Sequence, residues 1–118
     1  MKRAERGAHA ERQAADWLQA KGMRLIARNV RSRFGEIDLI MEDGATLVFV
    51  EVRYRVRNDY GGAAASVTAT KQARLRRAIG VYIARHPHAG SRILRADVVA
   101  ISGTGEIEWI PNAFEGAT

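Results

Sequence analysis

The sequence predicts a single α/β domain in which a mixed β-sheet is flanked by helices. Two stretches carry apolar residues at helical spacing, residues 4–21 and a second that begins at Thr68 or Thr70 and runs to Arg85. Five shorter stretches are rich in strand-forming residues, which gives the order α-β-β-β-α-β-β. With 118 residues the chain is long enough for one core of this layered kind, over residues 1–118.

The first helix is expected to end at Gly22, because glycine readily takes the left-handed conformation that closes a helix. Residues three and four apart lie on one side of a helix. The inward stripe predicted on this basis is Ala8, Glu11, Ala15 and Leu18. Glu11 is the one acid on that stripe.

The predicted strands span residues 23–30, 35–41, 46–55, 92–101 and 106–110. The turn signal Glu42-Asp43-Gly44 makes the second and third strands a hairpin. Residues 58–65 read as a loop. Pro87 stops the second helix, whose predicted apolar face consists of Leu75, Ala78, Ile79, Tyr82 and Ile83. These assignments place the acids discussed below on neighbouring elements.

The composition narrows the class of protein. The absence of cysteine excludes a disulfide framework and a thiolate zinc site, and it fits a reducing compartment. The N-terminal residues lack the apolar stretch of a signal peptide, and no window approaches the roughly 18 apolar residues of a membrane span. We therefore expect a cytoplasmic protein.

The positive charges are unevenly distributed. The formal net charge is +6 and the pI is about 10.5. No acid lies between Asp59 and Asp97, where the cations are Lys71, Arg74, Arg76, Arg77, Arg85, Arg92 and Arg95. A block of one sign attracts polyanions, which favours nucleic acid as the partner. The alternative is an ordinary solvated helix face.

Glu51 interrupts an apolar strand, between Val50 and Val52. Alternate strand residues share a face. The third strand therefore presents Leu47, Phe49, Glu51, Arg53 and Arg55 on one side. In the second strand Glu36, Asp38 and Ile40 share a face, opposite Ile37, Leu39 and Met41. The hairpin brings Asp38 and Glu51 close together.

Two buried carboxylates are costly unless a cation compensates them. One solution is an ion pair, because Arg53 lies on the same face as Glu51. The other is a divalent metal, which carboxylate oxygens suit. Glu11 would add a third acid from the first helix. Alternatively, Glu11 is a surface acid paired with Arg12 or Lys21.

Four segments, GEIDLI, VFVEVRYR, SVTATKQARL and DVVAI, together resemble the YraN family of small bacterial proteins. The resemblance runs from Gly7 to Phe114. That family is similar to restriction-endonuclease-like nucleases and archaeal Holliday-junction resolvases. The resemblance implies a restriction-endonuclease-like fold and dependence on Mg²⁺ or Mn²⁺. It also implies hydrolysis of phosphodiester bonds in branched or structured DNA.

The resemblance assigns roles by position. The signature shared by those nucleases is an Asp, then a Glu-x-Lys on the next strand, with a further Glu on the preceding helix. Asp38 and Glu51 match the two strand acids and Glu11 the helix glutamate, so the resemblance implies these three as metal ligands. Arg53 stands where the signature has a lysine. Arginine can stabilise developing negative charge but does not act as a base in proteins. Either Arg53 serves electrostatically, or Lys71 replaces the lysine, or the site is inactive. The predicted catalytic residues are Asp38, Glu51, Arg53 and Lys71.

The predicted nucleic-acid contacts are Arg53, Arg55, Arg57, Lys71, Gln72, Arg74 and Arg77. A second hypothesis keeps the fold and the nucleic-acid binding without catalysis, with a docked partner protein. A third is a structural adaptor in which the acids form an ion-pair network. A resolvase-like role predicts a two-fold homodimer, which the sequence does not show.

Overall fold

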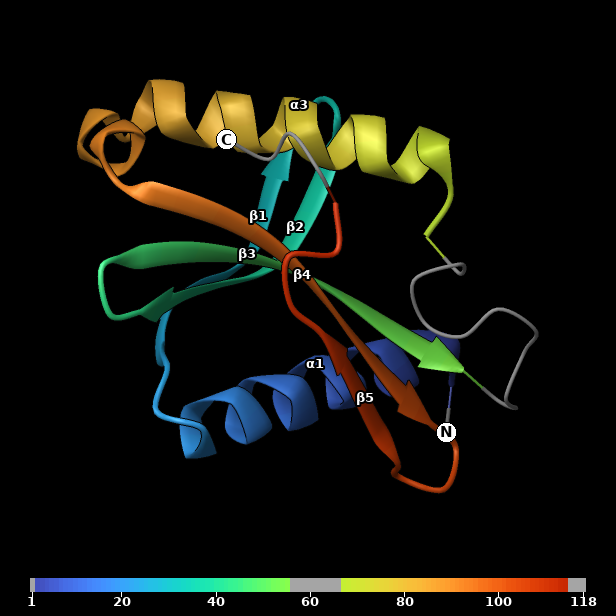
Figure 1. The fold of residues 1–118 in the computed structure, drawn as a ribbon. Helices are drawn as coiled ribbons and strands as arrows, with labels where there is room; N and C mark the ends of the chain where they lie inside the picture. The colour runs from blue at the N-terminus through green and yellow to red at the C-terminus, as the bar shows by residue number, and fades with distance from the viewer. Residues whose placement is uncertain (1, 56–66, 115–118) are drawn as a thin grey trace.

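The structure, a computed structural model, describes residues 2–55 and 67–114. A five-stranded sheet lies between two helices (Figure 1). The elements are α1 (Arg3–Ala20), β1 (Arg24–Ser32), β2 (Gly35–Asp43), β3 (Thr46–Arg55), α3 (Ala69–Arg85), the 3₁₀ turn η1 (Pro87–Ser91), β4 (Ile93–Ser102) and β5 (Ile107–Ile110). The predicted fold class and element order are confirmed. The predicted loop at residues 58–65 lies outside the described residues.

The strands follow one another across the sheet in chain order, β1-β2-β3-β4-β5. All neighbouring pairs are antiparallel except β3 and β4, which are parallel. A parallel pair needs a long crossover connection, and α3 lies within it. The sheet is therefore mixed, as predicted.

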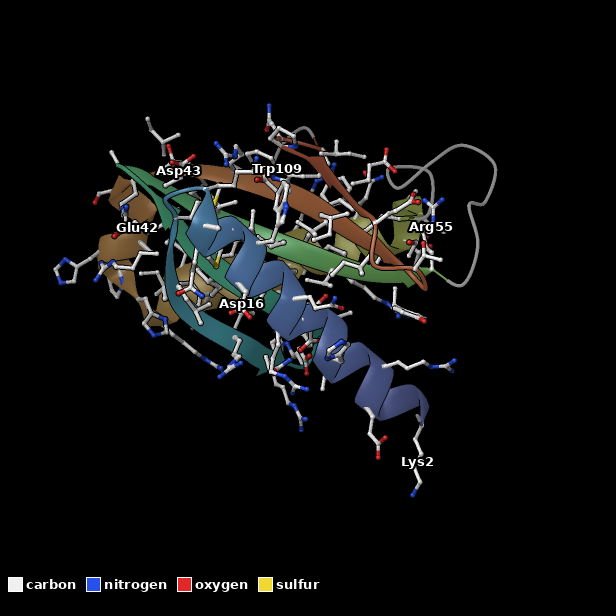
Figure 2. All side chains as sticks on the ribbon, turned by 90° about the horizontal axis from the view of Figure 1, so that it is seen from below. Lys2, Asp16, Glu42, Asp43, Arg55 and Trp109 are labelled. Carbon is white, nitrogen blue, oxygen red and sulfur yellow. The ribbon has the colours of Figure 1, made fainter. Side chains whose placement is uncertain are left out.

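Helix α1 covers one face of the sheet, seen from the helix side in Figure 2. Gly22 follows the helix with φ of +99°, which confirms it as the terminator. The buried helix residues are Ala10, Ala14, Ala15 and Leu18. The predicted stripe was wrong at Ala8, which is exposed, and Glu11 is half-buried. This helix has alanines on several sides, so spacing alone does not fix which side packs.

Helix α3 covers the opposite face. Thr68 caps it by accepting a hydrogen bond from the Lys71 backbone N–H at 3.3 Å. Four residues of its predicted apolar face are buried, Leu75, Ala78, Ile79 and Tyr82, and the fifth, Ile83, is half-buried. Neither helix in the described part of the chain has an apolar run long enough to span a bilayer.

The sheet separates two apolar cores. Leu47 and Phe49 pack toward α3, whereas Val48 and Val50 pack toward α1. This confirms the predicted alternation of β3 up to the position of Glu51.

In β2 the predicted alternation was wrong, because Ile37 and Ile40 both pack on the α3 side. The register of β1 with β2 passes from Arg28↔Leu39 to Val30↔Ile37, with Asn29 and Asp38 between. Asn29 has φ of +52°, a left-handed conformation that interrupts the pleat.

One carboxylate, Asp97 on β4, is fully buried and well satisfied. Its two oxygens accept hydrogen bonds from Arg95 Nε at 2.9 Å and Arg95 Nη2 at 3.1 Å. They also accept from Trp109 Nε1 at 3.0 Å and the Asn112 backbone N–H at 2.8 Å. Asp97 therefore ties β4 to β5 and to the chain that follows β5.

Candidate functional site

The candidate site lies where β2 and β3 separate. Their pairing runs from Asp43↔Thr46 to Leu39↔Val50 and stops there. Beyond that point Asp38 Oδ2 accepts the Val52 backbone N–H at 2.9 Å. The Asp38 carboxylate thus takes the place of the main-chain carbonyl that would accept this hydrogen bond in a regular strand pair. The hydrogen bond holds Asp38 between the two strands.

Three acids converge at this opening. Glu11 from α1 and Glu36 and Asp38 from β2 each present an oxygen, and these oxygens lie within 4.8 Å of one another. Asn29 Nδ2 donates to Glu11 Oε1 at 2.7 Å and to Glu36 Oε1 at 2.8 Å. The interruption at Asn29 therefore brings the helix acid and a strand acid together.

Glu51 approaches from the α3 side of the sheet. It lines a cavity of about 170 Å³ together with Phe34, Gly35, Glu36, Lys71, Arg74 and Leu75. Glu36 belongs to this cavity and also to the Asn29 network, so it joins the two halves of the site. Four acids from three elements thus meet where β2 and β3 separate.

The acids perturb one another. Burial, and next the charge of Glu51, raise the pKa of Asp38 to about 8, against the lowering effect of the Val52 N–H. Burial also raises the pKa of Glu51, although the charges of Arg53 and Lys71 oppose that rise. Asp38 and Glu51 therefore oppose each other's ionisation. The local cations do not fully compensate the acids.

Arg53 meets Glu51 only at long range. Its Nη1 lies 3.8 Å from Glu51 Oε1, near the limit for an ion pair. Its Nε is buried and has no hydrogen-bond partner in the described residues. The predicted ion pair is therefore present, but it does not cancel the effect of burial on the pKa of Glu51.

Several predicted residues lie along α3. Lys71 and Arg74 line the cavity that contains Glu51. Gln72 Nε2 donates to the Val67 carbonyl at 3.1 Å, which closes the start of the helix. The Arg77 guanidinium lies 5.9 Å from the centre of the Phe34 ring. Lys71, Arg74 and Arg77 are thus grouped near the acids.

The remaining predicted contacts are placed differently. Arg55 is buried and lines a separate cavity with Ser102 and Glu106. It lies at the opposite end of the sheet from Glu42 and Asp43 (Figure 2). Arg57 lies outside the described residues.

Sequence reasoning missed three residues of the site. Glu36 carried a usable signal, because it precedes Asp38 by two on a predicted strand. Asn29 carried little, beyond the tolerance of asparagine for left-handed backbone. Phe34 falls in a predicted connection between strands and was not considered. Its position at the cavity wall follows from the packing of α3 over the β1–β2 turn.

The donor set fits a hard divalent cation. Carboxylate oxygens from Glu11, Glu36 and Asp38 are close enough together to share one ion. Mg²⁺ and Mn²⁺ prefer such oxygen ligands, and Mg²⁺ usually keeps several waters besides one or two carboxylates. Glu36 therefore lies with two of the predicted metal ligands, Glu11 and Asp38. The third predicted ligand, Glu51, is a neighbour of Asp38 outside this group.

Comparisons with known proteins agree on one family. Residues 10–101 match the family described as "Uncharacterised protein family UPF0102". A UPF0102 protein of Nitrosomonas eutropha is 53% identical over 110 residues, which is 93% of each chain. UPF0102 proteins YraN of Escherichia coli and Shigella flexneri are 54% identical over 105 residues, or 88% of this chain and 79% of theirs. The chain therefore belongs to the UPF0102 family, the family of YraN.

Proposed function

We propose that this protein is a metal-dependent nuclease that hydrolyses phosphodiester bonds in branched or structured DNA. The observation that carries the proposal is the convergence of four acids in the gap between β2 and β3, with too little positive charge to compensate them. A purely structural ion-pair network would balance its charges, as the surroundings of Asp97 do.

Glu11, Glu36 and Asp38 would hold Mg²⁺ or Mn²⁺. When bound, the ion supplies charge neutralisation at the scissile phosphate and lowers the pKa of a bound water. The protein's own part is to hold the ligands in place. Asn29 restrains Glu11 and Glu36 through its amide, and the Val52 N–H restrains Asp38.

The cations of the site would act on the phosphate. Lys71 lines the cavity and already interacts with Glu51, so its ammonium can donate to a phosphate oxygen there. The Arg53 guanidinium stays protonated, so its role would be to stabilise negative charge that develops in the transition state. Arg74 and Arg77 extend the positive surface along α3 and would bind neighbouring backbone phosphates.

A second candidate function is nucleic-acid binding without catalysis. It is favoured by arginine at position 53, where the nuclease signature has lysine. In this case the basic surface would still bind DNA, with an affinity that falls steeply as salt increases.

Calorimetric titration with Mn²⁺ separates these possibilities. We expect saturable binding by the wild type, and its loss in Asp38→Asn and in Glu36→Gln. Glu106→Gln, which alters an exposed acid of the β4–β5 turn, is the matched control and should bind normally. Cleavage of a labelled four-way junction in Mg²⁺ would then be measured on the same proteins.

The outcomes are distinct. Metal binding with cleavage that Asp38→Asn abolishes supports the nuclease. Metal binding without cleavage of any DNA supports the silent binding protein. Absence of saturable Mn²⁺ binding would overturn the proposed metal site.

A further inference from the structure

Phe34 lies in the turn between β1 and β2, and its side chain is half-buried. Ser32 and Gly35 form the last pair of the two strands and enclose Arg33 and Phe34. Such turns favour small and polar residues. Phe34 belongs to neither of the two apolar cores that the described residues form. A large aromatic side chain at this position therefore calls for another explanation.

The turn that carries Phe34 is held rigidly. Ser32 Oγ donates to the Gly35 carbonyl at 3.0 Å and accepts the Phe34 backbone N–H at 3.2 Å. Gly35 has φ of +128°, a conformation that other residues rarely adopt. The ring thus starts from a fixed backbone, which reduces the entropy lost when a ligand binds to it.

The surroundings of the ring are cationic. The guanidinium groups of Arg33 and Arg77 lie over the Phe34 ring, with their central carbons 4.9 and 5.9 Å from its centre. Phe34 also lines the cavity that contains Glu51, Lys71 and Arg74. An aromatic face, four cations and the candidate metal ligands therefore adjoin one another.

We propose that Phe34 stacks against an unpaired base, so that the substrate carries a single-stranded segment beside the phosphate held at the acids. The proposal deepens the proposed function and rests on it. Bases inside a duplex stack on one another and do not offer their faces, whereas an unpaired base does. The base would displace a guanidinium group from over the ring, and Arg33 and Arg77 would then bind the phosphates on either side of that base.

The cationic surroundings favour a nucleotide over an apolar ligand. Arg33, Lys71, Arg74 and Arg77 attract phosphates, and no acid stands among residues 60–96. Aromatic stacking is tolerant of sequence, because every base has a flat face. We therefore expect selection for unpaired structure and little selection for sequence.

Fluorescence anisotropy with labelled oligonucleotides tests this. Single-stranded DNA and a blunt duplex of equal length are titrated in EDTA, so that cleavage plays no part. Phe34→Leu keeps an apolar side chain but removes the aromatic face. We expect it to weaken single-strand binding by about 5- to 150-fold, the effect of losing one stacked base, and to leave duplex binding unchanged.

Two further variants complete the design. Phe34→Trp restores a flat ring and should bind single strands as the wild type does. Ile26→Ala is the control, because Ile26 is an exposed apolar residue that lines a different cavity of the same sheet. A 2-aminopurine base in the oligonucleotide should lose emission on binding the wild type and Phe34→Trp, and retain it with Phe34→Leu.

Wild-type affinity of Phe34→Leu for single strands would overturn the proposal, as would an equal loss on the duplex. Such a result would leave the nuclease standing if the metal and cleavage tests succeed. Conversely, loss of single-strand binding in Phe34→Leu without any metal binding would keep the stacking site and refute the nuclease.

Discussion

Two carboxylates of the sheet, the fully buried Asp97 and the half-buried Asp38, differ in how far their surroundings compensate the negative charge. Asp97 is fully buried and accepts four hydrogen bonds, two of them from Arg95. Asp38 accepts a hydrogen bond from the Val52 backbone N–H and shares another with Glu51, and its charged neighbours are the acids Glu51, Glu11 and Glu36. The first arrangement serves the fold. The second arrangement lacks compensating positive charge, which a bound ligand can supply.

Removal of Asp97 should cause the largest loss of stability. Asp97→Ala leaves the Trp109 N–H without its acceptor and leaves Arg95 with only the longer contact to Asp43. We therefore expect the free energy of unfolding to fall by about 3–5 kcal/mol. Urea denaturation at pH 7 measures this. Glu106→Ala, at an exposed position, should change stability by less than about 0.5 kcal/mol. A loss in Asp97→Ala as small as that control would remove the contrast between the two acids.

Replacement of Asp38 should have the opposite sign. Because its pKa is raised from 3.8 to about 8, the folded state binds the proton more tightly than the unfolded state. Its contribution to stability is therefore fully present below about pH 4 and is lost as the pH rises toward 8. Asp38→Asn retains an acceptor for the Val52 N–H. At pH 9 we expect it to be more stable than wild type by about 3 kcal/mol, less than the full pKa difference implies because Asp38 stays partly solvated.

Denaturation curves at several pH values between 4 and 9 would test this expectation. The gap between Asp38→Asn and the wild type should widen with pH. A gap that is constant, or that narrows, would mean that Asp38 is ionised without strain and that the acids are compensated.

A divalent metal ion should supply at Asp38 the positive charge that Arg95 already supplies at Asp97. Mn²⁺ at about a hundred times its Kd should stabilise the wild type by about 2.7 kcal/mol and Asp38→Asn not at all. Thermal unfolding with and without Mn²⁺ measures the effect. The stabilisation should shrink toward pH 5, because the ligands must lose protons to bind. Equal stabilisation of the variant would place the ion elsewhere.

Arg53 should contribute least to stability. Its ion pair with Glu51 is long and partly exposed, so Arg53→Met should cost under about 1 kcal/mol. The pKa of Glu51 should rise further, because Arg53 is the strongest influence that lowers it. An NMR titration of the Glu51 side chain measures this, with Arg24→Met, whose partner is Glu42, as the control. An unchanged pKa of Glu51 would show that Lys71 and the hydrogen bond with Asp38 oppose the effect of burial without Arg53.

The sequence predicted those parts of the site that depend on a regular period. The fold order, the α3 face and the alternation around Glu51 all follow from spacings of 3.6 or 2. Asp38 and Glu11 were found because an acid on an apolar face is conspicuous. Glu36 gives a similar signal, because it precedes Asp38 by two residues on the same strand.

The other parts of the fold and of the site depend on departures from these regular spacings. The left-handed Asn29 breaks the alternation of β1 and β2, so a rule of strict alternation placed Ile37 on the wrong face. The position of Phe34 depends on how α3 packs above a turn, which is a contact between distant segments. Neither feature leaves a periodic trace in the sequence.

The end of the β2–β3 pairing has a consequence for the order in which the protein folds. From Glu51 onward, β4 is the strand that pairs with β3 in the described part of the chain, through Glu51↔Val98, Val52↔Val99 and Arg53↔Ala100. That pairing joins segments far apart in sequence, so it should form late. In stopped-flow refolding with Mn²⁺ we expect metal binding to appear with the slowest phase, and its appearance in an earlier phase would refute this order. A growing chain that has released only the segment from α1 to β3 would then carry all four acids and still lack an assembled site.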